Sequence, residues 1–329
     1  MSVSIAMVKA PKIEAIQRPI VIPDPEGSRD NEVRPFAIEG MDVRGRAVRL
    51  GTVADQILSA HNYPDPVARI LGEMLILAGL LGSMLKFKGI VTLQAKSGGA
   101  IPMVVVDYEV RDDGIGRLRG YAQIDEAKLA TYGKNPSFNG LIGTKNGYLA
   151  LTIDQGEDMD RYQGIVDLKG ENLAEVARNY FMNSEQTPTE LRLTCERDAV
   201  TGNWRAGGIM VQHLARGETG RERILDRETK EQWERASILM SSVKPIELLD
   251  PALDLDQLLY RLYHEDGVRV FEAAHLMKGC RCDRERLLAV LAQFSEDDID
   301  HMLEDGKIGV NCQFCNKTFD FTPEEARNQ

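Results

Sequence analysis

Four of the five cysteines form two close pairs near the C-terminal end of the sequence. One residue separates Cys280 from Cys282, two residues separate Cys312 from Cys315, and 29 residues lie between the pairs. Thiolates are soft ligands, and four of them at such spacing suit a tetrahedral zinc ion with zinc–sulfur bonds of about 2.3 Å. The spacing therefore predicts one zinc ion bound by these four cysteines.

Other interpretations of the cysteines remain open. The zinc ion could be a purely structural staple, whereas a redox motif of the thioredoxin type is disfavoured because no strand–helix–strand pattern surrounds either pair. His275 and His301 lie near the cysteines and could replace one ligand, although four thiolates already complete a tetrahedral shell. Cys195 shares strand parity with Leu191 and Leu193, which predicts a buried and inert thiol.

The same four cysteines can convert an oxidant into a loss of structure. Zinc binding contributes about 10–16 kcal/mol in comparable small peptides. Disulfides between near neighbours, Cys280 with Cys282 and Cys312 with Cys315, would close very short loops and contribute only about 1.5–2 kcal/mol each. Nothing would then connect the two halves of the segment, so we expect oxidation to unfold it. Thiol–disulfide exchange could still select other pairings.

Composition and charge limit the classes of protein to consider. The chain has 329 residues, about two domains in length, with 43% hydrophobic and 28% charged residues, as in an ordinary globular protein. The formal net charge is −11, and 15 acidic against 6 basic side chains lie between residues 246 and 306. Such a field repels nucleic acids and acidic membrane surfaces, so neither is an expected partner.

Two further features predict a soluble cytoplasmic protein. The N-terminal residues lack the positive start, apolar run and small-residue cleavage site of a secretory signal. The most apolar segment, residues 74–85, is 12 residues long, whereas a membrane span needs about 20. In a reducing compartment, paired cysteines favour metal or redox chemistry over structural disulfides.

The elements that must position the cysteines begin after a proline-containing extension, residues 1–34. Apolar residues then recur at helical spacing over residues 53–85, with a break at Pro64 and Pro66. Strand patterns follow at residues 90–96, 101–110, 117–124, 148–154, 162–168, 190–197 and 209–214. A helix at residues 172–182 interrupts them. This order predicts an α+β core domain with a mostly antiparallel sheet over residues 35–220.

Strand patterns stop near residue 220. Two helices, residues 221–243 and 253–264, carry too little apolar surface to stand alone and must pack on other elements. Their apolar side chains are Trp233, Ile238, Leu239, Met240, Leu248, Leu249, Leu258, Leu259 and Leu262. We therefore expect a metastable helical linker over residues 221–275, packed on the sheet of the core domain.

The last segment, residues 276–329, is predicted to be a small zinc-binding redox-switch domain. Its helix starts are well marked in the sequence. Ser295 with Asp298, and Thr322 with Glu325, have the three-residue spacing of helix capping boxes.

Enzymatic motifs are absent from the sequence. We find no HExxH, no GxSxG and no Walker-type GxxxxGK[ST]. Gly114, Gly116 and Gly120 miss the dinucleotide-binding spacing. Ser184 beside Glu185 fits a hydrogen-bonding role at a helix end better than a nucleophile with its base. We therefore expect a protein that is not an enzyme.

Residues 279–286 together with residues 312–315 resemble the redox-switch domain of the bacterial heat shock protein 33 family, which are redox-regulated holdase chaperones. The resemblance extends over residues 38–325. Other segments that resemble the family are residues 54–86, 161–164, 180–189, 206–208 and 259–265.

This resemblance implies one zinc ion per chain, bound by Cys280, Cys282, Cys312 and Cys315 in the reduced protein. Oxidation of these cysteines to disulfides would release zinc, unfold the zinc domain and the linker, promote formation of a homodimer and expose a surface for unfolded client proteins. ATP-dependent chaperones would later refold those clients. Two other functions remain alternatives: a structural zinc-ribbon adaptor, whose binding would ignore redox state, and a thiol–disulfide oxidoreductase, which would need an exposed cysteine of low pKa and turnover.

Overall fold

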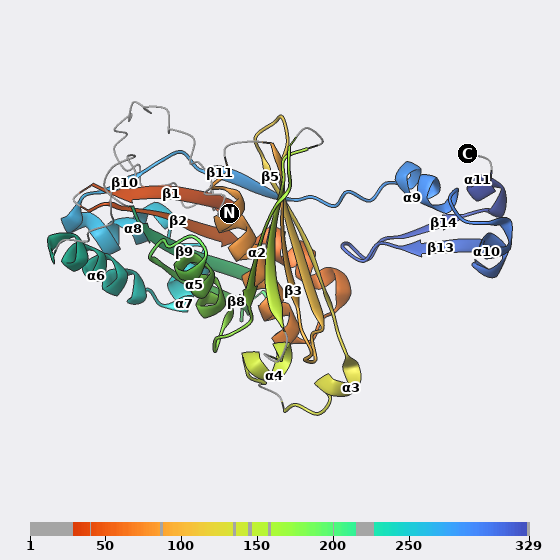
Figure 1. Cartoon of the computed structure of the whole chain (residues 1–329), viewed down its shortest axis with the longest axis horizontal. Coiled ribbons are helices and arrows are strands. Elements are labelled where there is room, and N and C mark those ends of the chain that lie inside the picture. The colour runs from red at the N-terminus through yellow and green to blue at the C-terminus, as the bar shows by residue number, and fades with distance from the viewer. Residues whose placement is uncertain are drawn as a thin grey trace.

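The computed structural model describes residues 29–39, 41–85, 88–133, 136–143, 147–156, 159–199, 201–214 and 227–327 of the chain. Residues 1–28 of the predicted extension and residues 221–226 of the predicted linker lie outside this part. The described residues form a large sheet packed against helices, followed by a small C-terminal unit (Figure 1). This is the predicted α+β class. None of the described helices is long and apolar enough to cross a membrane.

The large sheet contains 11 strands. They are β1 (Glu32–Ile38), β2 (Val43–Leu50), β3 (Gly89–Lys96), β4 (Met103–Val110), β5 (Gly116–Gln123), β6 (Tyr148–Asp154), β7 (Tyr162–Asp167), β8 (Thr189–Arg197), β9 (Trp204–His213), β10 (Val268–Val270) and β11 (Ala274–Lys278). Their order is β7-β6-β3-β4-β5-β11-β1-β2-β9-β8, and β10 also pairs with β1. The described pairs are antiparallel except β5 with β11, so the mostly antiparallel sheet is confirmed.

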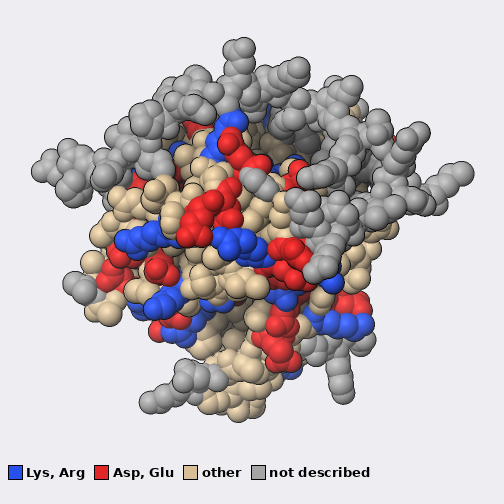
Figure 2. Space-filling view, turned by 90° about the vertical axis from the view of Figure 1, so that its left-hand side faces the viewer, with Lys and Arg blue, Asp and Glu red and all other residues tan. Residues whose placement is uncertain are grey.

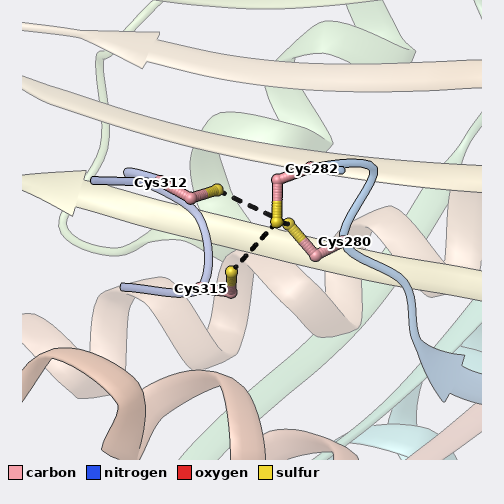
Figure 3. A group of neighbouring side chains, drawn as sticks. All are labelled: Cys280, Cys282, Cys312 and Cys315. Carbon is pink, nitrogen blue, oxygen red and sulfur yellow. Dashed lines mark hydrogen bonds between the residues drawn. The ribbon is translucent and has the colours of Figure 1, made fainter. Parts of the chain in front are cut away.

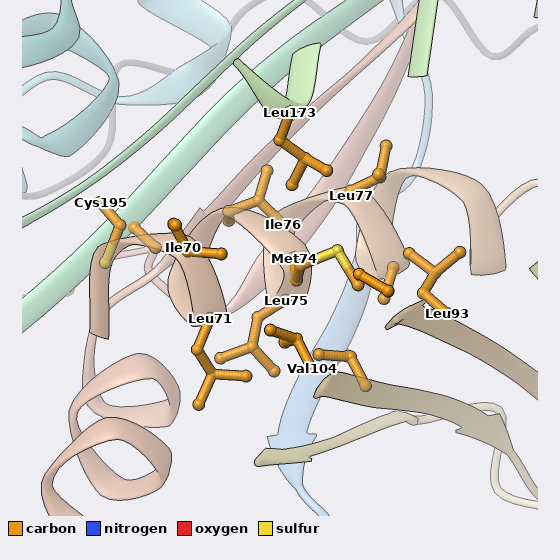
Figure 4. Packing of buried hydrophobic residues seen from close by; sticks show 14 of the residues in the cluster. Ile70, Leu71, Met74, Leu75, Ile76, Leu77, Leu93, Val104, Leu173 and Cys195 are labelled. Atoms are coloured by element: carbon orange, nitrogen blue, oxygen red, sulfur yellow. The ribbon is translucent and has the colours of Figure 1, made fainter. Parts of the chain in front are cut away.

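The long apolar helix packs against one face of this sheet and contacts strands from both of its halves. It is α2 (Asp65–Gly82), and it follows α1 (Thr52–Leu58) and the short η1 (Ser59–His61). Asn62, with a φ of 51°, and Pro64, just before α2, make the predicted break. The side chains of α2 point in several directions, toward Leu93 and Val104 on one side and Leu173 on another (Figure 4). Nearly all residues of α2 from Val67 to Gly82 are buried, because the sheet and α5 (Leu173–Asn183) surround it, whereas Arg69 is partly exposed and pairs with Glu196.

Local signals explain the helix that interrupts the strands. Asn172 precedes α5, and its side chain accepts a hydrogen bond from the Glu175 backbone N–H at 2.9 Å. An asparagine at this position satisfies a backbone N–H that the first helical turn leaves free. The predicted helix at residues 172–182 is thus confirmed to within one residue. Two short helices, α3 (Glu126–Leu129) and α4 (Phe138–Ile142), lie in the connection from β5 to β6.

The linker helices cover the face of β1, β2 and β9 that points away from α2. They are α6 (Arg227–Ser241), α7 (Pro245–Leu249) and α8 (Leu255–Tyr263), followed by η2 (His264–Asp266). Alternation along β2 explains the two faces, because Val48 packs with α2 whereas Ala47 packs with the linker. The buried members of this second cluster are Phe36, Ile38, Met41, Val43, Ala47, Ile209, Val211, Ala236, Met240, Val243, Leu248, Leu253, Leu255, Leu258, Leu259 and Tyr263.

The outer side of the linker carries many charged side chains beside exposed apolar ones such as Ile246. Basic and acidic side chains are interspersed on the end of the molecule that Figure 2 shows, which is the end where α6 and α8 lie in Figure 1. Arg235 of α6, for example, forms ion pairs with Glu265 and Asp266. One prediction for the linker is wrong: Ile238 is 68% exposed and does not belong to the buried set.

The C-terminal unit is small. It contains α9 (Arg284–Leu291), α10 (Glu296–His301), β12 (Leu303–Glu304), β13 (Lys307–Asn311), β14 (Thr318–Phe321) and α11 (Pro323–Arg327). Both predicted capping boxes are present: Ser295 and Asp298 exchange hydrogen bonds before α10, and Thr322 and Glu325 do so before α11. Its buried core has only six hydrophobic residues, Leu291, Ile299, Ile308, Phe319, Phe321 and Ala326.

Several strands differ from the sequence prediction. The strands β1 and β2 were not predicted, and residues 32–34, assigned to the unpacked extension, lie in β1, where Val33 is fully buried. Strands also continue beyond residue 220, as β10 and β11 in the large sheet and β12 to β14 in the C-terminal unit. These strands are short or carry proline and arginine, so their local patterns are weak, and pairing with distant strands determines their conformation.

Candidate metal centre

The sulfur atoms of Cys280, Cys282, Cys312 and Cys315 meet at one point, within 4.8 Å of one another (Figure 3). The Sγ atom of Cys280 lies 3.3 Å from that of Cys282 and 3.6 Å from that of Cys312, and the Sγ atoms of Cys282 and Cys315 are 3.4 Å apart. All four side chains are half-buried. The structure therefore brings together the four predicted ligands from two distant segments.

Local backbone structure holds each pair in place. Cys280 and Cys282 lie between β11 and α9, and the Asp283 side chain starts α9 by accepting a hydrogen bond from the Arg286 backbone N–H at 2.8 Å. Cys312 and Cys315 lie in the turn between β13 and β14. This turn is closed by a bond from the Asn316 backbone N–H to the Cys312 carbonyl at 2.7 Å, and Asn316 has a φ of 57°. An asparagine tolerates this left-handed conformation better than most residues.

The donor set and its dimensions fit a zinc ion. A tetrahedron with zinc–sulfur bonds of about 2.3 Å has sulfur–sulfur edges of about 3.8 Å. Three of the six separations, 3.3 to 3.6 Å, and the upper limit of 4.8 Å bracket that edge. Soft thiolates select zinc over hard cations such as magnesium. The arrangement can hold one metal ion, and its ligands suit zinc.

Cys280 and Cys282 differ in acidity. Burial raises the pKa of Cys280, but hydrogen bonds from the Cys282 backbone and from the neighbouring thiols outweigh burial and lower that pKa to about 7. Burial, followed by the hydrogen bonds to Cys280 and Cys315, raises the pKa of Cys282. Hydrogen bonds from the neighbouring thiols thus favour the thiolate form at Cys280.

The separations of the sulfur atoms do not select one disulfide pairing. Cys280 is as close to its near neighbour Cys282 as Cys282 is to Cys315 across the two segments, to within 0.1 Å. All six pairings fall within 4.8 Å. The pairing of near neighbours stays a prediction.

Other residues considered from the sequence lie away from this cluster. His301 contacts the backbone of Asp297 through Nδ1, and neither His301 nor His275 joins the four cysteines. Cys195 is buried at 2% exposure beside Gly72, and burial raises the pKa of its thiol, which confirms a buried thiol apart from the cluster. Glu185 accepts hydrogen bonds from two tyrosine hydroxyls rather than from a nucleophile.

Several arginines attach the linker to the sheet, and the sequence analysis did not identify the most buried of them, Arg49. Arg49 of β2 is only 1% exposed, and it donates hydrogen bonds to the carbonyls of Leu248 at 2.8 Å, Leu253 at 2.6 Å and Glu247 at 3.0 Å. Gly207 of β9 allows this close approach, because a Cβ atom there would lie 2.5 Å from the Leu248 carbonyl oxygen. No sequence signal separates Arg49 from the other arginines of β2, since only the docked linker gives it a role.

Comparisons with known proteins agree with this architecture. The family model described as Hsp33 protein matches residues 31–322. The 33 kDa chaperonin of Caulobacter vibrioides (strain NA1000 / CB15N) is 42% identical over 313 residues, which cover 93% of this chain and 99% of that protein. The 33 kDa chaperonin of Pseudomonas aeruginosa (strain LESB58) is 38% identical over 297 residues, covering 89% and 92%.

A solved structure has the same fold. The crystal structure of the 33 kDa chaperonin, a heat shock protein 33 homolog, from Thermotoga maritima superimposes with a TM-score of 0.72. The superposition covers 91% of this chain and 97% of the Thermotoga maritima chain, at 24% sequence identity.

Proposed function

The chain belongs to the Hsp33 family of chaperones, and from that premise we propose that it is a redox-regulated, ATP-independent holdase. Oxidation of the four cysteines would turn it from an inactive into a client-binding form. One observation carries this proposal: the only described group of metal-binding type joins two segments of a unit whose own core has six buried residues. Such a unit depends on that group for its stability.

In the reduced protein, Cys280, Cys282, Cys312 and Cys315 would hold one zinc ion. When bound, zinc supplies charge neutralisation for four thiolates and a crosslink between the two segments. The cysteines stand 3.3 to 3.6 Å apart at their closest, which supports this assignment.

Oxidation would remove the ligands. Each pair of thiolates gives two electrons to one peroxide molecule, and solvent supplies two protons, so that one disulfide and two water molecules form. Two peroxide molecules therefore consume all four ligands. Disulfides between near neighbours would leave no bond from residues 280–282 to residues 312–315. Peptide mapping after oxidation tests the pairing, and a predominance of bonds between Cys280 and Cys315 would contradict it.

Unfolding of the C-terminal unit would then free the linker. The linker helices have little stability of their own and are held by packing on the sheet. Their release would expose apolar side chains such as Leu258 and Leu259 together with Phe36 and Ile209 beneath them, all buried in the docked state. A contiguous apolar surface of this kind is the expected binding site for unfolded client proteins.

The wider setting follows from the same proposal. We propose that the oxidised protein forms a homodimer, acts in the cytoplasm and passes its clients to ATP-dependent chaperones for refolding. The domain limits proposed for this cycle are residues 35–220 for the core, 221–275 for the linker and 276–329 for the switch. No enzymatic turnover is part of the proposal.

The test compares reduced and peroxide-treated protein in suppressing aggregation of a chemically unfolded enzyme. We expect suppression only after oxidation, together with loss of one zinc ion per chain. Cys312→Ser should lose most of its zinc, whereas Cys195→Ser, a matched change at the buried remote thiol, should keep it. Equal suppression in both redox states, or full zinc content in Cys312→Ser, would contradict the proposal.

A further inference from the structure

One buried carboxylate, Asp107 of β4, lies beneath the four-cysteine cluster. Its side chain is 6% exposed. The Oδ1 atom accepts a hydrogen bond from the Thr92 hydroxyl at 2.7 Å, and the Oδ2 atom accepts one from Arg119 Nε at 2.7 Å. Arg281 donates a further short hydrogen bond to the same Oδ2 atom. Two guanidinium groups therefore share one carboxylate, one from the sheet and one from the cysteine segment.

Arg119 extends this network to the second pair of cysteines. Its guanidinium carbon lies 3.8 Å from the centre of the Phe314 ring, a cation–π contact. Tyr121, two residues along β5, meets the same ring edge-on with centroids 5.0 Å apart. Phe314 is thus held on the sheet by the arginine that Asp107 orients.

The positions of these contacts in the sequence are informative. Arg281 is the one residue between Cys280 and Cys282, and Phe314 lies between Cys312 and Cys315. Each cysteine pair therefore sends its own intervening side chain to the same carboxylate, directly or through Arg119. Movement of either pair away from the sheet has to break one of these two contacts.

Backbone contacts flank the network without replacing it. The Gly279 N–H donates to the Leu118 carbonyl at 2.8 Å, and the Asn316 side chain donates to the Ala60 carbonyl at 2.9 Å. Both bonds involve neutral groups at the edge of the contact. The charged contacts are more sensitive to disruption. Asp107 is buried and its two arginine partners are half-buried, so loss of the carboxylate leaves Arg281 and Arg119 close together without a counter-charge.

We propose that Asp107 is a positioning residue that fixes both cysteine pairs on β4 and β5 and so determines how readily the metal centre opens. This inference deepens the proposed function, on which it rests. With Asp107 in place, the two cysteine loops are held in one arrangement, so a cysteine that dissociates from the metal would rebind quickly. Without it, Arg281 and Arg119 repel each other and the Cys280–Cys282 loop leaves the sheet.

The first measurement is the rate at which the reduced, zinc-loaded full chain transfers zinc to a chromogenic chelator. We expect Asp107→Asn and Arg281→Gln to transfer zinc about tenfold faster than the unaltered protein, which corresponds to about 1.4 kcal/mol. Arg281→Lys, which keeps the charge and a donor, should restore most of the slow rate. Lys307→Gln is the matched control, because it removes one positive charge from an exposed position of the same unit.

The second measurement is hydrogen exchange of the backbone amides of residues 279–282, which reports on the Arg281 contact without relying on the metal. These amides should exchange faster in Arg281→Gln and at the normal rate in Lys307→Gln. Arg281→Gln leaves the Asp107–Arg119 pair intact, so it tests the inference even if Asp107→Asn does not fold. Normal zinc transfer and normal exchange in Arg281→Gln would overturn the role of Asp107.

The two proposals can fail separately. Neither measurement uses an oxidant or a client, so lack of chaperone activity after oxidation would overturn the holdase function and leave faster zinc transfer in Arg281→Gln as support for positioning. Conversely, a normal rate in that variant, with chaperone activity present, would overturn only the positioning role.

Discussion

Replacement of Arg49 by methionine should release the linker without oxidation. Arg49 donates three hydrogen bonds to linker carbonyls, those of Leu248, Leu253 and Glu247, and its side chain is fully enclosed. Methionine has a similar length and fills the space, but it donates nothing. The change therefore leaves three carbonyls facing an apolar side chain when the linker is docked.

The size of the effect can be worked from these contacts. A buried carbonyl without a donor costs about 1–3 kcal/mol, so three of them cost at most about 9 kcal/mol. Burial lowers the pKa of Arg49, which shows that its charge is costly to bury, and methionine removes that cost. We expect a net loss of about 3 kcal/mol in the docking free energy, or about a hundredfold in the docking equilibrium.

The assay is hydrogen exchange of residues 245–263 in the reduced protein, with aggregation suppression measured on the same samples. Arg192→Met is the matched control, because Arg192 makes one exposed hydrogen bond, to the Ser241 carbonyl at 2.9 Å, worth about 0.5–1.5 kcal/mol. Arg49→Met should exchange faster in this region and suppress aggregation while reduced, with β3 to β6 still protected. Normal exchange in Arg49→Met, or equal effects of both substitutions, would refute this reasoning.

Three other perturbations have defined outcomes. Gly207→Ala should also loosen the linker, because its Cβ atom would collide with the Leu248 carbonyl 2.5 Å away, and faster protease cutting between residues 232 and 264 of the reduced protein would show this. Leu258→Asp with Leu262→Asp should give aggregation suppression in the reduced protein; inactivity until oxidation would contradict it. Burial, and then the nearby Glu196 carboxylate, raise the pKa of Glu73 to about 8. Between pH 4.5 and 8 the folded state therefore keeps a proton that the unfolded state has released, so the stability of the fold decreases as pH rises through this range. Glu73→Gln should therefore raise stability at pH 8 by about 4 kcal/mol and leave it nearly unchanged at pH 4, as thermal unfolding at both pH values would show.

The parts of the structure that the sequence predicts are those with a strong local pattern. The apolar run of α2, the hairpin strands β3 to β5 and the cap at Asn172 are each specified by neighbours in sequence, and each lies within a few residues of its expected place. The cysteine cluster was predictable for a different reason. The spacing of the thiols indicates one shared metal site, whatever structure the intervening 29 residues adopt.

The parts that the sequence does not predict depend on contacts between distant segments. Arg44 and Arg46 occupy alternate positions of β2, a pattern that indicates an exposed edge strand. The strand is nevertheless covered on both faces, by α2 and by the linker. Asp107 and Phe314 have no motif of their own, and their roles arise only when the cysteine loops lie on β4 and β5. Long-range burial of this kind leaves little periodic signal.

The most direct test of the redox switch follows zinc and the linker in one sample. The full chain is treated with peroxide, and zinc release is recorded beside hydrogen exchange of residues 232–264 and of β2 to β9. We predict that exchange of the linker rises in step with zinc release while the sheet strands stay protected, and that both changes reverse on reduction with zinc present. Zinc release that leaves the linker as protected as in the reduced protein would contradict the coupling between the cysteine centre and the client-binding surface.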